Sequence, residues 1–165
     1  MRVLPPDRRL RVIVHCDGAA RGNPGPAGIG VQITDGHGTV LAEIARGLGI
    51  ATNNQAEYTA AIEGLKRARE LGAAEVTLRS DSHLMVEQLS GRYRVKNPTL
   101  QRLHKEARDA AAPFDRVRFE HVPRERNKEA DRLANQGVDA WLAAGGGVTS
   151  PSPHPRLWEE ETGPR

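Results

Sequence analysis

The chain has 165 residues, of which 38% are hydrophobic and 27% are charged, and its formal net charge is +3. This length suits one domain with a sizeable core, and the absence of a signal-peptide pattern or of an apolar run that could span a bilayer favours a cytoplasmic protein. The single cysteine, Cys16, excludes an intramolecular disulfide and a metal site built from several thiolates.

Three strands are predicted in the first third of the chain, after a polar leader at residues 1–10. Alternating apolar residues place these strands at residues 11–16, 29–33 and 39–48. A glycine-rich loop at residues 17–26 separates the first two. It lacks the Gly-Lys-Ser/Thr of a phosphate-binding loop and leads into a strand, not a helix, so we interpret it as a hairpin connection.

A long helix is predicted to begin after Thr52. Thr52 followed three residues later by Gln55 is typical of a capping box, and the apolar period continues to Leu71. Glu57 lies in the first turn and shares its face with apolar residues further along the helix. A carboxylate that points toward a poorly solvated core needs a cation beside it.

Strands and helices alternate in the second half of the chain. The apolar pattern predicts them in turn at residues 75–80, 82–90, 100–112, 117–119 and 127–144. The glycines and prolines that follow predict a disordered tail at residues 145–165, so the domain should span residues 11–144. Three meandering strands followed by this alternation predict an α/β fold with a mixed sheet flanked by helices.

Four acidic residues stand at the ends of different predicted elements, and each is aimed toward the core: Asp17, Glu57, Asp81 and Asp131. Any one of them could be a cap or a turn former, but four such acids would repel one another unless divalent cations hold them together. Ligands that are all oxygen select hard cations, so we expect two Mg²⁺ ions, with Mn²⁺ as a possible substitute. A two-ion site can activate water for attack at phosphorus, so the chemistry needs neither a covalent protein nucleophile nor an organic cofactor.

Basic residues gather in two segments, residues 92–96 and residues 116–128. Runs of charge are usually just solvated faces. Beside an acidic metal site they favour a nucleic acid as the partner, because a phosphate backbone must be drawn toward carboxylates that repel it.

Several motifs resemble those of the type 1 ribonuclease H family: Asp17-Gly18, residues 22–26, residues 52–57, Ser80-Asp81-Ser82 and residues 127–134. The resemblance covers residues 11–144 and implies a five-stranded mixed sheet in the order 3-2-1-4-5. It implies endonucleolytic hydrolysis of the RNA strand of an RNA–DNA hybrid, which leaves 5′-phosphate and 3′-hydroxyl ends. The four acids would then be the catalytic metal ligands, and the family's nucleic-acid contacts would fall on Asn23, Thr52, Asn53, Lys96 and Asn97.

Three departures from the family pattern stand out. Residues 91–99 are too few to hold the basic protrusion that some members carry, so hybrid binding would depend on the basic loop there. The loop at residues 123–126 lacks the family's usual histidine. His121 lies too early to replace it and is expected at a strand end, and His83 stands where a glutamine is common.

Two other functions are alternatives to this one, and a monomer is expected in each case. A nuclease of the same fold could act on double-stranded RNA or DNA. A non-catalytic hybrid-binding module could also keep the fold, but it would have no reason to retain four mutually repelling acids.

Overall fold

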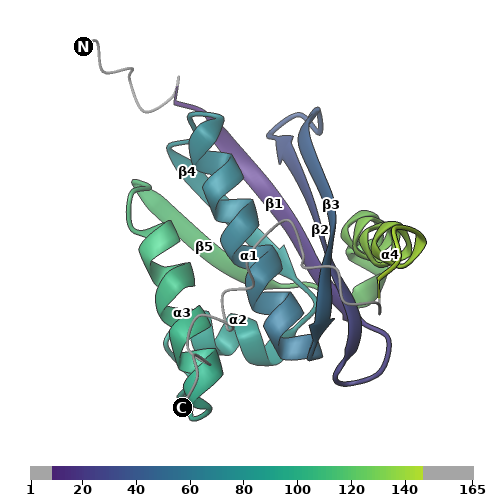
Figure 1. Cartoon of the computed structure of the whole chain (residues 1–165). Helices are drawn as coiled ribbons and strands as arrows, with labels where there is room; N and C mark the ends of the chain where they lie inside the picture. The colour runs from purple at the N-terminus through teal and green to yellow at the C-terminus, as the bar shows by residue number, and fades with distance from the viewer. Residues whose placement is uncertain (1–8, 147–165) are drawn as a thin grey trace.

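The computed structural model describes residues 9–146, so the predictions made for residues 1–8 and for the tail from residue 147 lie outside the described part of the chain. One mixed sheet with helices on both faces makes up the fold (Figure 1). In chain order the elements are β1 (Arg11–Ala20), β2 (Gly25–Asp35), β3 (Val40–Ala51), α1 (Asn53–Glu70), β4 (Glu75–Ser80), α2 (His83–Leu89), α3 (Pro98–Ala111), β5 (Arg116–His121), the short 3₁₀ turn η2 (Arg124–Arg126) and α4 (Lys128–Ala143). None of the helices within residues 9–146 is long and apolar enough to cross a membrane.

The strand order is β3-β2-β1-β4-β5, which confirms the predicted order. The pairs β1–β2 and β2–β3 are antiparallel, whereas β1–β4 and β4–β5 are parallel. Parallel neighbours end at the same edge of a sheet. The last pair of the β1–β4 ladder is His15 with Arg79, so Asp17, two residues further along β1, comes beside Asp81 after β4.

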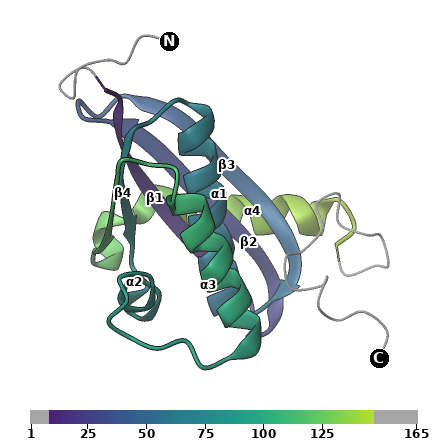
Figure 2. The ribbon, with the colours of Figure 1, turned by 90° about the vertical axis from the view of Figure 1, so that its left-hand side faces the viewer.

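The two faces of the sheet carry different helices (Figures 1 and 2). Helix α1 lies along β1 and β2 with α3 beside it, and α4 lies against β2 and β3. Side chains in β2 point alternately to the two faces. The side chain of Val31 lies next to Gly64 of α1, whereas a β-carbon on Gly30 would collide with the backbone of Ala130 in α4. The α1 face of β2 is therefore packed by branched side chains, and the α4 face by glycine.

Helix α4 approaches the sheet so closely that glycine is required on both sides of the contact. A β-carbon on Gly137 would lie 2.6 Å from backbone atoms of Arg46 in β3. A β-carbon on Gly28 would lie 2.5 Å from the carbonyl oxygen of Ala134 in α4. The position of α4 on the sheet is therefore set by backbone contact as well as by its buried side chains, Leu133, Ala134 and Val138.

The prediction of a long loop at residues 17–26 is wrong. Strand β1 continues to Ala20 and β2 begins at Gly25, because the antiparallel ladder runs on through the pair Ala20 and Ala27. Gly18 was interpreted as part of a turn, but a β-carbon there would clash with the backbone of Ala56 in α1. The glycine serves the close approach of a helix, not a turn.

Hydrogen bonds at both ends of the domain join residues just outside the predicted boundaries to the fold. The carbonyl oxygen of Leu10 accepts a hydrogen bond from the N–H of Ala74 at 2.9 Å. At the other end, the N–H of Gly146 donates to the carbonyl oxygen of Trp141 at 2.8 Å, and this turn closes α4. These residues, which the prediction assigned to the leader and the tail, contact the fold.

Candidate active site

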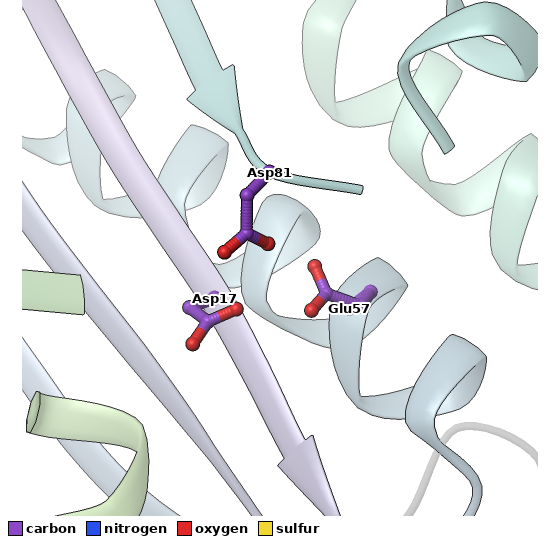
Figure 3. A group of neighbouring side chains, drawn as sticks. All are labelled: Asp17, Glu57 and Asp81. Carbon is purple, nitrogen blue, oxygen red and sulfur yellow. The ribbon is translucent and has the colours of Figure 1, made fainter. Parts of the chain in front are cut away.

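Three of the four predicted acids meet where β4 ends beside Asp17 of β1. Figure 3 shows the carboxylates of Asp17 from β1, Glu57 from α1 and Asp81 after β4 turned toward one another. One oxygen of each lies within 4.8 Å of the others. Asp17 and Glu57 are buried and Asp81 is half-buried, so the group forms the floor of a site that opens to solvent on the side of Asp81.

The start of α1 places Glu57. The predicted capping box is confirmed: the N–H of Thr52 donates to Oε1 of Gln55 at 2.8 Å, and the N–H of Gln55 donates to Oγ1 of Thr52 at 3.1 Å. This fixes the first turn of the helix. The carboxylate of Glu57 then accepts from the N–H of Gly18 at 3.2 Å and from the hydroxyl of Ser80 at 3.4 Å. Glu57 is therefore held by both β1 and β4.

Burial makes it unfavourable for all three acids to be ionised together. Burial first, and then the charge of Glu57, raise the pKa of Asp17 above its ordinary value. Burial also raises the pKa of Glu57 and of Asp81, although nearby Arg124 opposes the rise for Asp81. A bound divalent cation would relieve this repulsion, and hard oxygen ligands suit such an ion. The donor set therefore fits a divalent metal site.

Asp131 lies at the rim of the same site. It is in the first turn of α4 and is partly exposed, and it does not belong to the group of three close oxygens. The nearby carboxyl group of Asp131 is a minor cause of the raised pKa of Asp17, after burial and the charges of Glu57 and Asp81. Both residues border a cavity of about 500 Å³, which is lined by Asp17, Gly18, Ala19, Ala20, Arg21, Asn53, Glu57, Asp81, Arg124, Asp131 and Asn135.

Two of the predicted nucleic-acid contacts are joined by a hydrogen bond beside this cavity, Asn23 and Asn53. The N–H of Asn53 donates to Oδ1 of Asn23 at 3.1 Å, and Oδ1 of Asn53 accepts from the N–H of Ala20 at 3.1 Å. Both side chains are exposed, and within residues 9–146 neither Nδ2 group donates a hydrogen bond. These two amide donors are therefore available to a ligand.

The other predicted contacts lie at helix starts and in the basic loop. Thr52 caps α1, and Oδ1 of Asn97 caps α3 by accepting from the N–H of Leu100 at 3.1 Å. Lys96 is exposed one residue before this cap. Thr52 and Asn97 are thus helix caps in this structure. Whether they also contact a nucleic-acid backbone stays a prediction.

Asn127 stands at the cap position before α4, but its side chain makes no capping hydrogen bond. Its Nδ2 donates instead to the carbonyl oxygen of Cys16 at 2.9 Å, and the residue is buried. This contact ties the start of α4 to the strand residue just before Asp17.

Two residues that sequence reasoning missed, Arg21 and Asn135, line the cavity. Asn135 could have been found, because it lies four residues after Asp131 and so on the same face of α4. Arg21 gave no local signal. Of the second basic segment, Arg124 in η2 reaches the cavity, and His121 ends β5 as predicted.

Comparison with known proteins agrees with this fold. A family model described as "Reverse transcriptase-like" matches residues 15–137. The bifunctional protein Rv2228c of Mycobacterium tuberculosis is 51% identical over 132 residues, which are 79% of this chain and 36% of that protein. The chain thus spans little more than a third of this relative. Ribonuclease HI of Halobacterium salinarum is 44% identical over 137 residues, which cover 83% of this chain and 69% of the relative.

Solved structures give the same relationship. The crystal structure of RNase H1 from Halobacterium salinarum superposes with a TM-score of 0.77 at 44% identity, over 79% of this chain and 98% of that one. LC11-RNase H1, solved in complex with an RNA/DNA hybrid, gives a TM-score of 0.76 at 43% identity, over 79% of this chain and 99% of that one. The extent of the family match and the similarity to the archaeal enzyme show that the chain belongs to the ribonuclease HI family.

Proposed function

We propose that this protein is an endonuclease that hydrolyses the RNA strand of RNA–DNA hybrids and leaves 5′-phosphate and 3′-hydroxyl ends. The observation that carries the proposal is the group of three carboxylate oxygens within 4.8 Å of one another at the floor of an open cavity. The relative LC11-RNase H1 has been solved with an RNA/DNA hybrid, which supports the same substrate here.

The acids Asp17, Glu57, Asp81 and Asp131 would hold two Mg²⁺ ions, with Mn²⁺ as a possible substitute. All three other acids affect the pKa of Asp17, so Asp17 is our choice for the ligand that both ions would share. When bound, such ions supply an activated water and offset the charge that develops on the phosphate. The protein side chains need no proton-transfer or nucleophilic role of their own in bond cleavage.

The residues around the acids have separate tasks in this proposal. Glu57 is held by hydrogen bonds from Gly18 and Ser80, so its carboxylate is oriented before any ion binds. Arg124 lies near Asp81 and faces the cavity, where its guanidinium can hold a phosphate oxygen of the substrate. This interaction would place the reacting phosphate above the acids.

Strand recognition is assigned to the exposed amides and to the basic loop. The free Nδ2 donors of Asn23 and Asn53 lie beside the cavity and would bind the RNA strand, Asn53 on the side of the 2′-hydroxyl. Thr52 stands next to Asn53 at the start of α1. Lys96 and Asn97 would contact the backbone of the nucleic acid from the loop before α3.

The test compares three duplexes of one sequence, an RNA–DNA hybrid, double-stranded RNA and double-stranded DNA, each labelled on one strand. We expect cleavage of the RNA strand of the hybrid in Mg²⁺ or Mn²⁺, no cleavage in chelator, and products that carry a 5′-phosphate. Faster cleavage of double-stranded RNA or DNA would assign the protein to another nuclease class. Tight hybrid binding without cleavage in either metal would identify a binding module.

A further inference from the structure

A chain of hydrogen bonds links the short β1–β2 connection to the fourth acid across the cavity. It runs from Arg21, at the end of β1, through Asn135 to Asp131, both in α4. All three residues line the cavity, and the chain is separate from the contacts that hold Glu57. It therefore acts on the one acid that the sheet does not hold.

Asn135 contacts Asp131 through one turn of α4. Its Nδ2 donates to the carbonyl oxygen of Asp131 at 3.0 Å and to the carboxylate oxygen Oδ1 at 3.4 Å. The amide therefore donates to one carboxylate oxygen, and within residues 9–146 it makes no hydrogen bond to the other. A partly exposed aspartate would otherwise turn freely about its side-chain bonds, and this donor limits that freedom.

Arg21 decides which end of the Asn135 amide faces the acid. Its Nη2 donates to the main-chain carbonyl oxygen of Asn135 at 3.4 Å and to the side-chain amide oxygen Oδ1 of the same residue at 3.3 Å. Its Nη1 forms an ion pair with Asp139 at 2.8 Å. A guanidinium has donors and no acceptor, so it can bind only the oxygen of the amide. The N–H₂ end is thereby directed toward Asp131. Reversing the amide would break both contacts.

We propose that Asn135 is a positioning residue for Asp131, and that Arg21 acts through Asn135 by fixing the direction of its amide. The inference rests on the proposed function, since it concerns the metal site assigned there. Neither residue is given a direct role in the reaction. Groups that orient a metal ligand typically change metal affinity by about 10- to 100-fold when they are removed.

The first experiment measures Mn²⁺ binding in the absence of nucleic acid, from the electron paramagnetic resonance signal of the free ion. Asn135→Ala should weaken the affinity by about tenfold. The neighbouring Gln136→Ala, an exposed residue of the same helix, is the matched control and should leave it unchanged. Equal losses in both variants, or no loss in Asn135→Ala, would overturn the proposal.

Kinetics provide a second readout. For Asn135→Ala, the Mg²⁺ concentration that gives half the maximal single-turnover rate should rise about tenfold, while the rate at saturating Mg²⁺ stays within about threefold of wild type. Circular dichroism melts show whether the variant is folded. A loss of saturated rate without a change in metal requirement would mean that Asn135 contacts the substrate and does not orient Asp131.

A double-mutant cycle tests the role of Arg21. Arg21→Ala should weaken Mn²⁺ binding several-fold in the wild-type background and have no further effect in the Asn135→Ala background. An increase in the KM for hybrid of the same size in both backgrounds would show that Arg21 binds the strand directly, which contradicts its positioning role. If the wild-type protein binds Mn²⁺ but cleaves no hybrid, the proposed function fails, whereas the binding measurements still decide the inference.

Discussion

Replacement of Asp81 by asparagine should abolish hybrid cleavage and stabilise the metal-free protein. The Asp81 carboxylate lies within 4.8 Å of those of Asp17 and Glu57. Two unit charges at that distance repel by about 1 kcal/mol in bulk water and by about 3.5 kcal/mol at an effective dielectric constant of about 20. Attraction to Arg124 offsets part of the repulsion. We therefore expect a net gain of about 1 kcal/mol in the free energy of unfolding, or about 4 °C in melting temperature.

The gain should depend on pH in a defined direction. Burial raises the pKa of Asp81 in the folded state above its ordinary value of 3.8, while Arg124 opposes the rise. A carboxyl group whose pKa is raised by folding destabilises the fold once it is ionised. The advantage of Asp81→Asn should therefore be full above the raised pKa, and it should disappear as the pH falls toward 3.8, the ordinary value.

Circular dichroism melts at pH 8, in chelator and in Mg²⁺, make the comparison. Mg²⁺ should raise the melting temperature of the wild type and raise that of Asp81→Asn much less, so the order of stability reverses between the two conditions. Asp109→Asn is the control, because Asp109 is an exposed acid in α3 that pairs with Lys105 at 2.8 Å. The reasoning would be refuted if Asp81→Asn melted several degrees below wild type in chelator, since Asp81 would then be a structural acid.

Three further predictions concern the loop before α4, the helix itself and the tail. Arg124→Ala and Glu125→Ala should each lower the multiple-turnover rate by about tenfold or less, whereas Asp131→Asn should lower the single-turnover rate by at least about a thousandfold. A loop variant as inactive as Asp131→Asn would indicate a missed catalytic group. Gly137→Ala should lower the melting temperature, although alanine favours helices, because the new β-carbon would lie 2.6 Å from backbone atoms of β3. An unchanged melting temperature would contradict the close packing. Removal of residues 147–165 should leave the single-turnover rate unchanged within about twofold, and lost cleavage would assign the tail to the catalytic domain.

The acids could be found from the sequence because each one follows a strong local signal. Asp17 and Asp81 come at or after apolar runs, and parallel strands bring such ends together once the topology is known. Glu57 follows a capping box that the structure confirms. Local periodicity was therefore sufficient to predict the helices and the three acids that meet.

The sequence could not show features that depend on contacts between distant segments. Gly18 was interpreted as a turn residue because glycine is frequent in turns, and only the packing of α1 shows why it lies in a strand. Arg21 and Asn135 are 114 positions apart in the chain, so neither predicts the other. Asn127 has the residue type and position of a cap, but a buried carbonyl group of β1 binds its side chain instead.

The close seating of α4 on glycine also bears on how the protein is made. Asp17, Glu57 and Asp81 leave the ribosome well before α4, which is the last helix of the described chain. Until α4 emerges, the glycine-lined face of β2 has no cover and the site lacks its fourth acid. If the proposed function is right, a nascent chain should therefore be inactive toward hybrids until its final helix docks. A polypeptide whose synthesis stops before residue 128 should contain three of the four acids but should not cleave nucleic acid.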